Sequence, residues 1–253
     1  MYAVISDIHG NLEALEAVLA DMPDGVETVY CLGDVVGYGA SPNECCELVR
    51  ERGMPTISGN HDLAVTDLST DLDWFNPVAA AAVLWTRERL SEENAEFLRT
   101  RPRTISTEGA LFVHGSIRDP DEYITTSSAA EENLELLKSR HPGLPVCFFG
   151  HTHVKAVAPP PPDDAVLDKG RFDLGVDGPY LLNPGSVGQP RDGDPLASYV
   201  LVEAGNVGAA ENGRPAGPVV TYRAVEYDIE RAQAKIRAAG LPEMLAERLA
   251  VGR

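Results

Sequence analysis

The chain has 253 residues, enough to enclose a substantial hydrophobic core, and 43% of them are apolar, as in ordinary globular proteins. Its 21 basic and 39 acidic residues give a net charge of −18, which opposes nonspecific binding to nucleic-acid backbones and anionic membranes. No apolar run approaches the length of a membrane span, and residues 1–6 lack the features of a signal peptide, so we expect a cytoplasmic protein without membrane attachment.

The negative charge does not exclude a small phosphorylated substrate, because bound divalent cations would reverse the local field. The cysteines show no Cys-x-x-Cys spacing and lie in apolar or helical segments, so we expect reduced, mostly buried thiols. They are Cys31, Cys45, Cys46 and Cys147. The sequence is compatible with a monomer and with a homo-oligomer.

Short apolar runs in the first part of the chain predict buried strands. The runs are residues 2–6, 28–32 and 55–58. Helical patterns follow the first two: Asn11 is placed to cap the first helix, and Ser41 opens the second, which extends to about Arg52, with a capping-box pattern. Such alternation favours a parallel sheet with helices outside it.

The alternation of strands and helices is interrupted at residues 63–103. The helical pattern of this segment predicts a helical insertion. An alanine-rich helix covers residues 78–85, and Ser91 begins another that ends near Thr100. Trp74 and Phe75 precede the first of these helices. We interpret both as packing residues rather than as a platform for substrate.

The later part of the chain predicts further strands, two closing helices and two long loops. The expected strands are residues 110–113, 146–149, 154–157, 179–183, 198–203 and 219–225, the last two antiparallel. A capping box at Ser128 starts a helix to about Arg140, and the closing helices are residues 229–239 and 242–251. Prolines place residues 159–164 in an exposed loop, and residues 184–193 form a Gly/Pro loop. We expect one domain over residues 1–253.

Polar residues follow several of these runs in succession, and five of the six histidines are among them. They are Asp7, His9, Asp34, Asn60, His61, His114, His151 and His153. Because α/β sheets collect ligands at the carboxyl ends of their strands, we expect these residues to converge on one site. The sixth histidine, His141, is interpreted as a surface residue at a helix end.

The residue types predict a metal centre. Carboxylates, an amide oxygen and imidazoles suit Mn²⁺, Fe²⁺ or Zn²⁺ better than Ca²⁺, and the absence of a thiolate argues against structural zinc. In an extended strand, His151 and His153 would point to the same side. Without His61, the set contains seven candidate ligands, which is more than one ion needs but suits two ions. Two such ions can clamp a phosphoryl group and hold a hydroxide that attacks phosphorus in line.

The order of the motifs resembles the calcineurin-like metallophosphoesterase superfamily. Its pattern Asp-x-His, Gly-Asp, Gly-Asn-His-Asp/Glu, His and Gly-His-x-His matches residues 7 to 153, and the loop 183–186 is similar to that of small bacterial and archaeal phosphodiesterases of the superfamily. The resemblance implies an α/β fold (α+β in some schemes), a four-layer α-β-β-α sandwich of two mixed sheets with outer helices.

The resemblance also implies a role for each site residue. The first ion would be bound by Asp7, His9 and His153. The second would be bound by Asn60, His114 and His151. Asp34 would bridge the two ions, and His61 would face the substrate and assist the leaving oxygen.

One segment departs from the pattern of some members. Serine/threonine phosphatases and symmetrically cleaving diadenosine tetraphosphatases of the superfamily extend the second motif as Gly-Asp-x-Val-Asp-Arg-Gly. Here Gly37 replaces the aspartate that steadies the catalytic histidine, and Tyr38 replaces the arginine that grips phosphate. The departure argues against a protein phosphatase of that branch and leaves His61 without its usual orienting partner.

The sequence thus predicts a metal-dependent hydrolase of phosphate esters, with a small phosphodiester such as a nucleotide as the favoured substrate. The alternatives are a dinucleoside polyphosphate or a phosphomonoester. Arg191 is a candidate phosphate contact, although it could equally be a surface arginine paired with Asp192 or Asp194. A non-catalytic scaffold, as in one trafficking-complex subunit of the superfamily, is disfavoured because all the ligand positions are intact.

Overall fold

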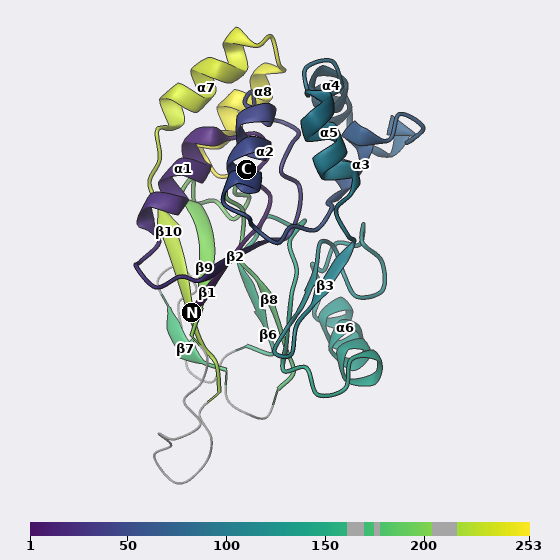
Figure 1. The fold of residues 1–253 in the computed structure, drawn as a ribbon, viewed down its shortest axis with the longest axis vertical. Coiled ribbons are helices and arrows are strands. Elements are labelled where there is room, and N and C mark those ends of the chain that lie inside the picture. Colours follow the sequence, from purple (N-terminus) through teal and green to yellow (C-terminus); the bar gives the residue numbers. More distant parts are fainter. Residues whose placement is uncertain (161–169, 175–177, 204–216) are drawn as a thin grey trace.

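The computed structural model describes residues 1–160, 170–174, 178–203 and 217–253. In these ranges the strands form two five-stranded mixed sheets (Figure 1). Sheet A contains, in spatial order, β2 (Thr28–Cys31), β1 (Tyr2–Ile5), β9 (Ala197–Glu203), β10 (Val219–Val225) and β7 (Arg171–Asp173). Sheet B contains, in spatial order, β3 (Thr104–Ser106), β4 (Leu111–Val113), β5 (Val146–Phe148), β8 (Tyr180–Asn183) and β6 (Ala156–Ala158).

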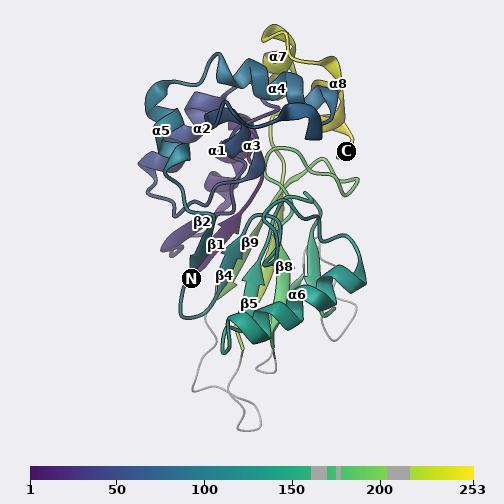
Figure 2. The same cartoon turned by 90° about the vertical axis from the view of Figure 1, so that its right-hand side faces the viewer.

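Helices cover both sheets. They are α1 (Leu12–Asp21), α2 (Pro42–Glu51), α3 (Asn60–Thr66), α4 (Pro77–Arg87), α5 (Glu92–Arg99), α6 (Ser127–Arg140), α7 (Ile229–Ala238) and α8 (Glu243–Glu247), with the 3-10 turns η1 (Leu72–Trp74) and η2 (Arg248–Ala250). Figure 2 shows α6 lying across β5 and β8, while the other helices gather around sheet A and beyond its upper end. In the described part of the chain, no helix is long and apolar enough to cross a membrane.

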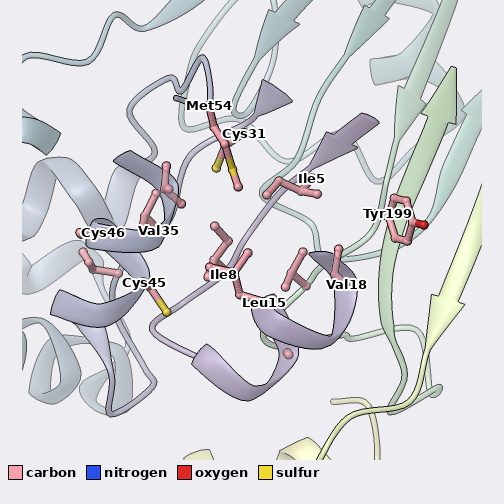
Figure 3. Packing of buried hydrophobic residues seen from close by; sticks show 14 of the residues in the cluster. Ile5, Ile8, Leu15, Val18, Cys31, Val35, Cys45, Cys46, Met54 and Tyr199 are labelled. Atoms are coloured by element: carbon pink, nitrogen blue, oxygen red, sulfur yellow. The ribbon is translucent and has the colours of Figure 1, made fainter. Parts of the chain in front are cut away.

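The alternation of side chains along the strands explains the layers. In β1, Ala3 and Ile5 belong to the core between sheet A and helices α1 and α2, whereas Val4 belongs to the core between the two sheets. Successive strand residues point to opposite faces, so a fully apolar strand can bury both. Figure 3 shows the outer core, with Ile5 of β1 near Leu15 of α1. On the other side, α6 packs on sheet B. The four-layer sandwich is therefore confirmed.

The first two βα units form as predicted, with one difference at a helix start. The side chain of Asn11 accepts a hydrogen bond from the backbone N–H of Ala14 and caps α1. Ser41 precedes α2, and Pro42 occupies its first turn, but the Ser41 side chain makes no capping hydrogen bond. It instead accepts from Nζ of Lys235, 3.3 Å away. The capping box predicted at Ser41 is wrong, although the helix is present.

Other local predictions also need correction. Residues 55–58 do not form a strand, because only one parallel bridge, between Cys31 and Thr56, joins them to β2. Helix α6 is capped by Thr126, whose side chain accepts from Ala129, rather than by Ser128. The strand expected at residues 154–157 is β6 and begins two residues later.

The loops and cysteines agree with prediction where the structure describes them. Pro159 and Pro160 are exposed, while residues 161–164 of the predicted loop lie outside the described residues. All four cysteines are free and buried, and Cys45 and Cys46 lie in α2 (Figure 3).

The predicted helical insertion contains most of α3 together with η1, α4 and α5. Helix α4 packs against α7 and α8 through Ala79 and Ala82. Phe75 is partly buried against this group, as expected of a packing residue. Trp74 is not, because its side chain is 90% exposed. The interpretation of Trp74 as a packing residue is therefore wrong.

Candidate metal centre

The candidate ligands lie where four strands end. Asp7 and His9 follow β1, Asp34 follows β2, and His114 follows β4, each within a few residues of its strand. His151 and His153 follow β5, and all six side chains are at most 4% exposed. Strands β1 and β2 are parallel, as are β4 and β5, so each sheet delivers its ligands at the carboxyl ends of neighbouring strands.

The backbone at these residues is strained. Six described residues other than glycine have a positive φ, and five of them are candidate ligands. They are Asp7, His9, Asp34, His151 and His153, with φ between 49° and 66°. This left-handed conformation is costly for residues with a Cβ and gathers at functional sites. His151 and His153 therefore do not lie in an extended strand, and that part of the prediction is wrong.

The first group of donor atoms belongs to Asp7, His9 and His153. Nδ1 of His9 donates to the carbonyl of Val36 over 3.1 Å, and Nδ1 of His153 donates to that of Gln189 over 2.6 Å. These bonds leave the lone pair of each Nε2 facing inward, a common arrangement of metal-binding histidines. The two Nε2 atoms lie 3.1 Å apart. Two lone pairs at this distance repel each other unless a cation lies between them.

The second group belongs to Asp34, His114 and His151. Nδ1 of His114 donates to the carbonyl of Leu32 over 2.8 Å, and its Nε2 lies 3.0 Å from Oδ1 of Asn60. Nε2 of His151 donates to the carbonyl oxygen of Asp121 over 3.2 Å. The other ring nitrogen, Nδ1, therefore keeps its lone pair and can bind a metal ion. Asn60 is thus brought to this group, as the sequence predicts.

Asp34 lies between the two groups. Its Oδ2 is 3.6 Å from Nε2 of His9 and 3.4 Å from Nε2 of His114. Its Oδ1 accepts a hydrogen bond from the backbone N–H of His61 over 2.8 Å. One carboxylate therefore faces imidazoles from both groups.

Burial determines the charge of most of these side chains. It lowers the pKa of His9 and His153 well below the usual value and that of His151 to about 3, so these imidazoles are neutral at pH 7, the form that binds metal. Burial alone would raise the pKa of Asp34, but nearby histidines, His114 first, lower it well below the usual value. Burial opposes the charge of His114, yet Asp34 raises its pKa to about 9.

These residues fit divalent cations. Oδ1 of Asp7 and Oδ2 of Asp34 are buried and have no hydrogen-bond partner among the described residues. Such atoms are costly to bury unless an ion or another partner satisfies them. Ligand atoms bound about 2.1 Å from one ion lie roughly 3.0–3.4 Å apart. The distance from Oδ1 of Asp7 to Nε2 of His153 is 3.4 Å, which agrees, and the distance from the same oxygen to Nε2 of His9 is somewhat longer, 3.8 Å.

His61 forms a third, overlapping group with His9 and Asp34, whose ligand atoms lie within 4.8 Å of one another, but its ring is held differently from the other imidazoles. It is 4% exposed, and its Nδ1 has no hydrogen-bond partner in the described part of the chain. Its ring instead contacts the rings of Tyr38, His9 and Phe75, with centroid separations of 4.5, 4.9 and 5.2 Å. Burial lowers the pKa of His61 to about 4, so it is neutral at pH 7. Aromatic packing thus orients the imidazole in a segment that lacks the usual aspartate.

Arg191 reaches this region from the 184–193 loop. Its Nη2 donates to Oε1 of Gln189 over 3.0 Å and lies 3.4 Å from the Tyr38 hydroxyl. The guanidinium lies 5.7 Å from the centroid of the Tyr38 ring. Asp192 instead pairs with Lys155 over 2.7 Å, and Asp194 accepts a hydrogen bond from the backbone N–H of Leu196. Among the described residues, neither aspartate forms the surface pair with Arg191 that was the alternative.

Two residues that support the site were not predicted. Asp62 accepts hydrogen bonds from the backbone N–H groups of Gly59 and Val36, which ties the start of α3, where Asn60 lies, to the loop after β2. Its place at the end of the Gly-Asn-His-Asp motif was the available signal. Tyr123 packs on His151 with ring centroids 3.8 Å apart, and nothing in its sequence context indicated this contact.

A cavity of about 540 Å³ opens beside these groups. Asn60, His61 and His151 line the part nearest the metal centre. The helical insertion contributes much of the remaining wall, including Trp74 and Phe75. A substrate held in this cavity would reach the candidate ligands directly.

Comparison with known proteins agrees with this geometry. A family model described as the calcineurin-like phosphoesterase superfamily domain matches residues 1–206. The chain is 39% identical to an uncharacterized protein of Methanocaldococcus jannaschii over 262 aligned positions, covering 100% of this chain and 98% of that protein. It is 27% identical over 142 residues to the symmetrical bis(5′-nucleosyl)-tetraphosphatase of Sodalis glossinidius, covering 54% of this chain and 50% of that one.

Among solved structures, a metallophosphoesterase from Sphaerobacter thermophilus is similar along its whole length. It shares 40% sequence identity and a TM-score of 0.79, covering 100% of this chain and 98% of that one. The matching family model, these full-length relatives and the buried His/Asp groups agree with one another. The chain therefore belongs to the calcineurin-like superfamily of metal-dependent phosphoesterases, close to its small archaeal and bacterial members.

Proposed function

We propose that this protein hydrolyses phosphodiesters with two divalent transition-metal ions, Mn²⁺, Fe²⁺ or Zn²⁺, and that small nucleotide-like diesters are its substrates. The observation that carries the proposal is the pair of inward-facing Nε2 atoms of His9 and His153, 3.1 Å apart, beside the unpartnered Oδ1 of Asp7. Neutral imidazoles and an ionised carboxylate are the ligands such ions prefer.

The donor groups support an assignment to two ions. The ligands of the first would be Asp7, His9 and His153. The ligands of the second would be Asn60, His114 and His151. The position of Asp34 between the groups supports a bridging role. When bound, such a pair supplies positive charge to the phosphoryl oxygens and activates the attacking water.

The side chains around the pair would orient the substrate. Asn60 can donate a hydrogen bond through its amide to an equatorial phosphoryl oxygen, where negative charge grows in the transition state. His61 lines the cavity and is neutral at pH 7, so we assign it a hydrogen bond to the leaving oxygen rather than the full transfer of a proton. Arg191, 3.4 Å from the Tyr38 hydroxyl, is a candidate second contact to phosphate.

A panel of substrates tests the proposal. The purified protein is loaded separately with Mn²⁺, Fe²⁺ or Zn²⁺, its metal content is measured, and phosphomonoesters, phosphodiesters, cyclic nucleotides and dinucleoside polyphosphates are compared. We expect metal-dependent turnover that is highest on a diester. His61→Ala and Asn60→Ala should each lose roughly 10²-fold or more in kcat. Wild-type turnover by His61→Ala on every ester would refute its role.

Hydrolysis of dinucleoside polyphosphates is a second candidate. Its support is the partial similarity to the Sodalis tetraphosphatase, whose name states that activity. Gly37 and Tyr38 argue against it, because they replace the residues that the symmetrically cleaving enzymes use. A non-catalytic metal-binding scaffold is the third and least favoured candidate, and a reconstituted protein that bound no metal would favour a scaffold role.

A further inference from the structure

Two exposed aromatic side chains line the 540 Å³ cavity, and nothing in the proposed chemistry uses their exposed surface. Trp74 belongs to the helical insertion and is 90% exposed, and Tyr123, which packs on His151, is 51% exposed. A large aromatic side chain that is mostly exposed is unusual in a globular protein. Where it borders a cavity, it marks a candidate contact for a ligand. The cavity is also within the range of about 300–1,000 Å³ typical of small-molecule sites.

The backbone holds Trp74 in place. Asp71 caps the short turn η1 by accepting from the N–H of Asp73, and the N–H of Phe75 bonds to the carbonyl of Leu72. Phe75 packs edge-on against His61 and against the helices behind it. The exposed indole therefore stands next to a residue anchored at the metal centre.

The charge of the cavity limits what it can bind. Among its described lining residues none is Lys or Arg, and the two charged ones, Asp71 and Asp121, are acidic. Asp121 lies 3.9 Å from Arg103 of a neighbouring segment, which offsets part of its charge. Additional phosphate groups in this space would meet carboxylates and find no Lys or Arg among the described lining residues, so the phosphoryl group of a substrate belongs at the metal centre and the cavity suits an uncharged group.

From these observations we infer that the cavity binds the uncharged aromatic group of a phosphoester, a nucleobase in a nucleotide substrate, with Trp74 as its stacking surface and Tyr123 as a further aromatic contact. The inference rests on the proposed function, which supplies the phosphoryl site. All nucleobases stack on aromatic side chains with similar strength. Trp74 would therefore favour substrates that carry an aromatic group but would not distinguish one base from another. Polyphosphate esters would be poor ligands.

Binding of two phosphonates tests this inference without turnover. One is the AMP analogue in which a methylene group replaces the ester oxygen, and the other is methylphosphonate, which has no base. The chain has two tryptophans, so Trp85→Phe leaves Trp74 as the only tryptophan, whose fluorescence can be excited selectively over that of tyrosine. In the metal-loaded protein we expect the AMP analogue, and not methylphosphonate, to quench Trp74 saturably.

Trp74→Ala should raise the Kd of the AMP analogue about fivefold or more by calorimetry and leave that of methylphosphonate unchanged. Leu68→Ala is the matched control, because Leu68 is a 75% exposed residue of the same insertion that does not line the cavity. Equal effects of the two substitutions on the Kd of the AMP analogue, or equal affinity of the wild-type protein for both phosphonates, would overturn this inference. Either result would leave the proposed function standing. If neither phosphonate bound in a metal-dependent way, the proposed function would fail, and this inference with it.

Discussion

Gly37 lies directly against the imidazole of His61, and a Cβ atom at Gly37 would come 2.5 Å from Nδ1 of that ring. Gly37 also has a φ of +92°, a conformation that disfavours any other residue. The glycine that replaces the family's orienting aspartate thus leaves the space in which the imidazole packs against Tyr38 and Phe75.

Gly37→Ala should therefore reduce activity by displacing His61. We expect a loss of roughly tenfold to 10²-fold in kcat with little change in bound metal, since a small misplacement of a catalytic group can cost that much. Gly25→Ala is the control, because Gly25 has a φ of +98° but no atom near its Cβ position. It should share the backbone penalty of about 1 kcal/mol in unfolding free energy and keep full turnover. Equal kcat values for the two variants would mean that the Gly37 contact does not position His61.

His151 and His153, only two residues apart, are expected to serve different ions. His153→Ala should release the ion held with Asp7 and His9, and His151→Ala should release the other. Elemental analysis should find about one ion per chain in each variant, and Mn²⁺-loaded variants should lose the magnetic coupling of a paired centre. His141→Ala, at the end of α6, serves as the control and should keep both ions. Retention of both ions by either variant would contradict the assignment of its imidazole to an ion.

Metal removal should destabilise the fold as well as abolish activity. Without cations, the buried oxygens of Asp7 and Asp34 remain unpartnered and the lone pairs of His9 and His153 oppose each other. An ion at 100 times its Kd adds about 2.7 kcal/mol to the free energy of unfolding, which in a chain of this size corresponds to a rise in Tm of about 5–10 °C. Calorimetry before and after chelation measures the difference, and Mn²⁺ should restore it. An unchanged Tm after complete chelation would argue against the buried groups being metal ligands.

The thiols should be unreactive in the native protein. Burial raises the pKa of Cys31, Cys45, Cys46 and Cys147 above the usual value, so the nucleophilic thiolate is scarce at pH 8. A disulfide reagent should label none of them in buffer and all four in denaturant. Because the folded-state pKa values are raised, labelling should begin only as the pH rises well beyond the usual thiol range. Rapid labelling of a native thiol at pH 7 would contradict the buried packing.

The sequence predicts buried strands well but misses two short, largely exposed strands at sheet edges. Strands β1, β4 and β5 are almost entirely buried, so each appears as a continuous apolar run. Strands β3 and β7 were not predicted, because they have exposed residues at both ends and only a half-buried one between. The position of β7 is set by pairing with β10, a long-range contact that no local pattern contains, whereas β3 forms a short hairpin with β4.

The membership of the candidate site was predictable, but its geometry was not. The motifs brought Asp34, Asn60 and His114 into one set, and the structure brings the same residues together. The left-handed backbone at His151 and His153 could not be foreseen, since residues with a Cβ disfavour it. The exposure of Trp74 was missed for a related reason, because tryptophan is usually buried and only tertiary structure reveals the cavity beside it.

Each proposed ion would take ligands from both sheets. Asp7 and His9 follow a strand of sheet A, whereas His153 follows one of sheet B, and Asp34 and His114 are divided in the same way. A bound ion is therefore a crosslink between the two halves of the sandwich. Separation of the two halves would take away part of the ligand set of each proposed ion, so metal binding should stabilise the assembled sandwich.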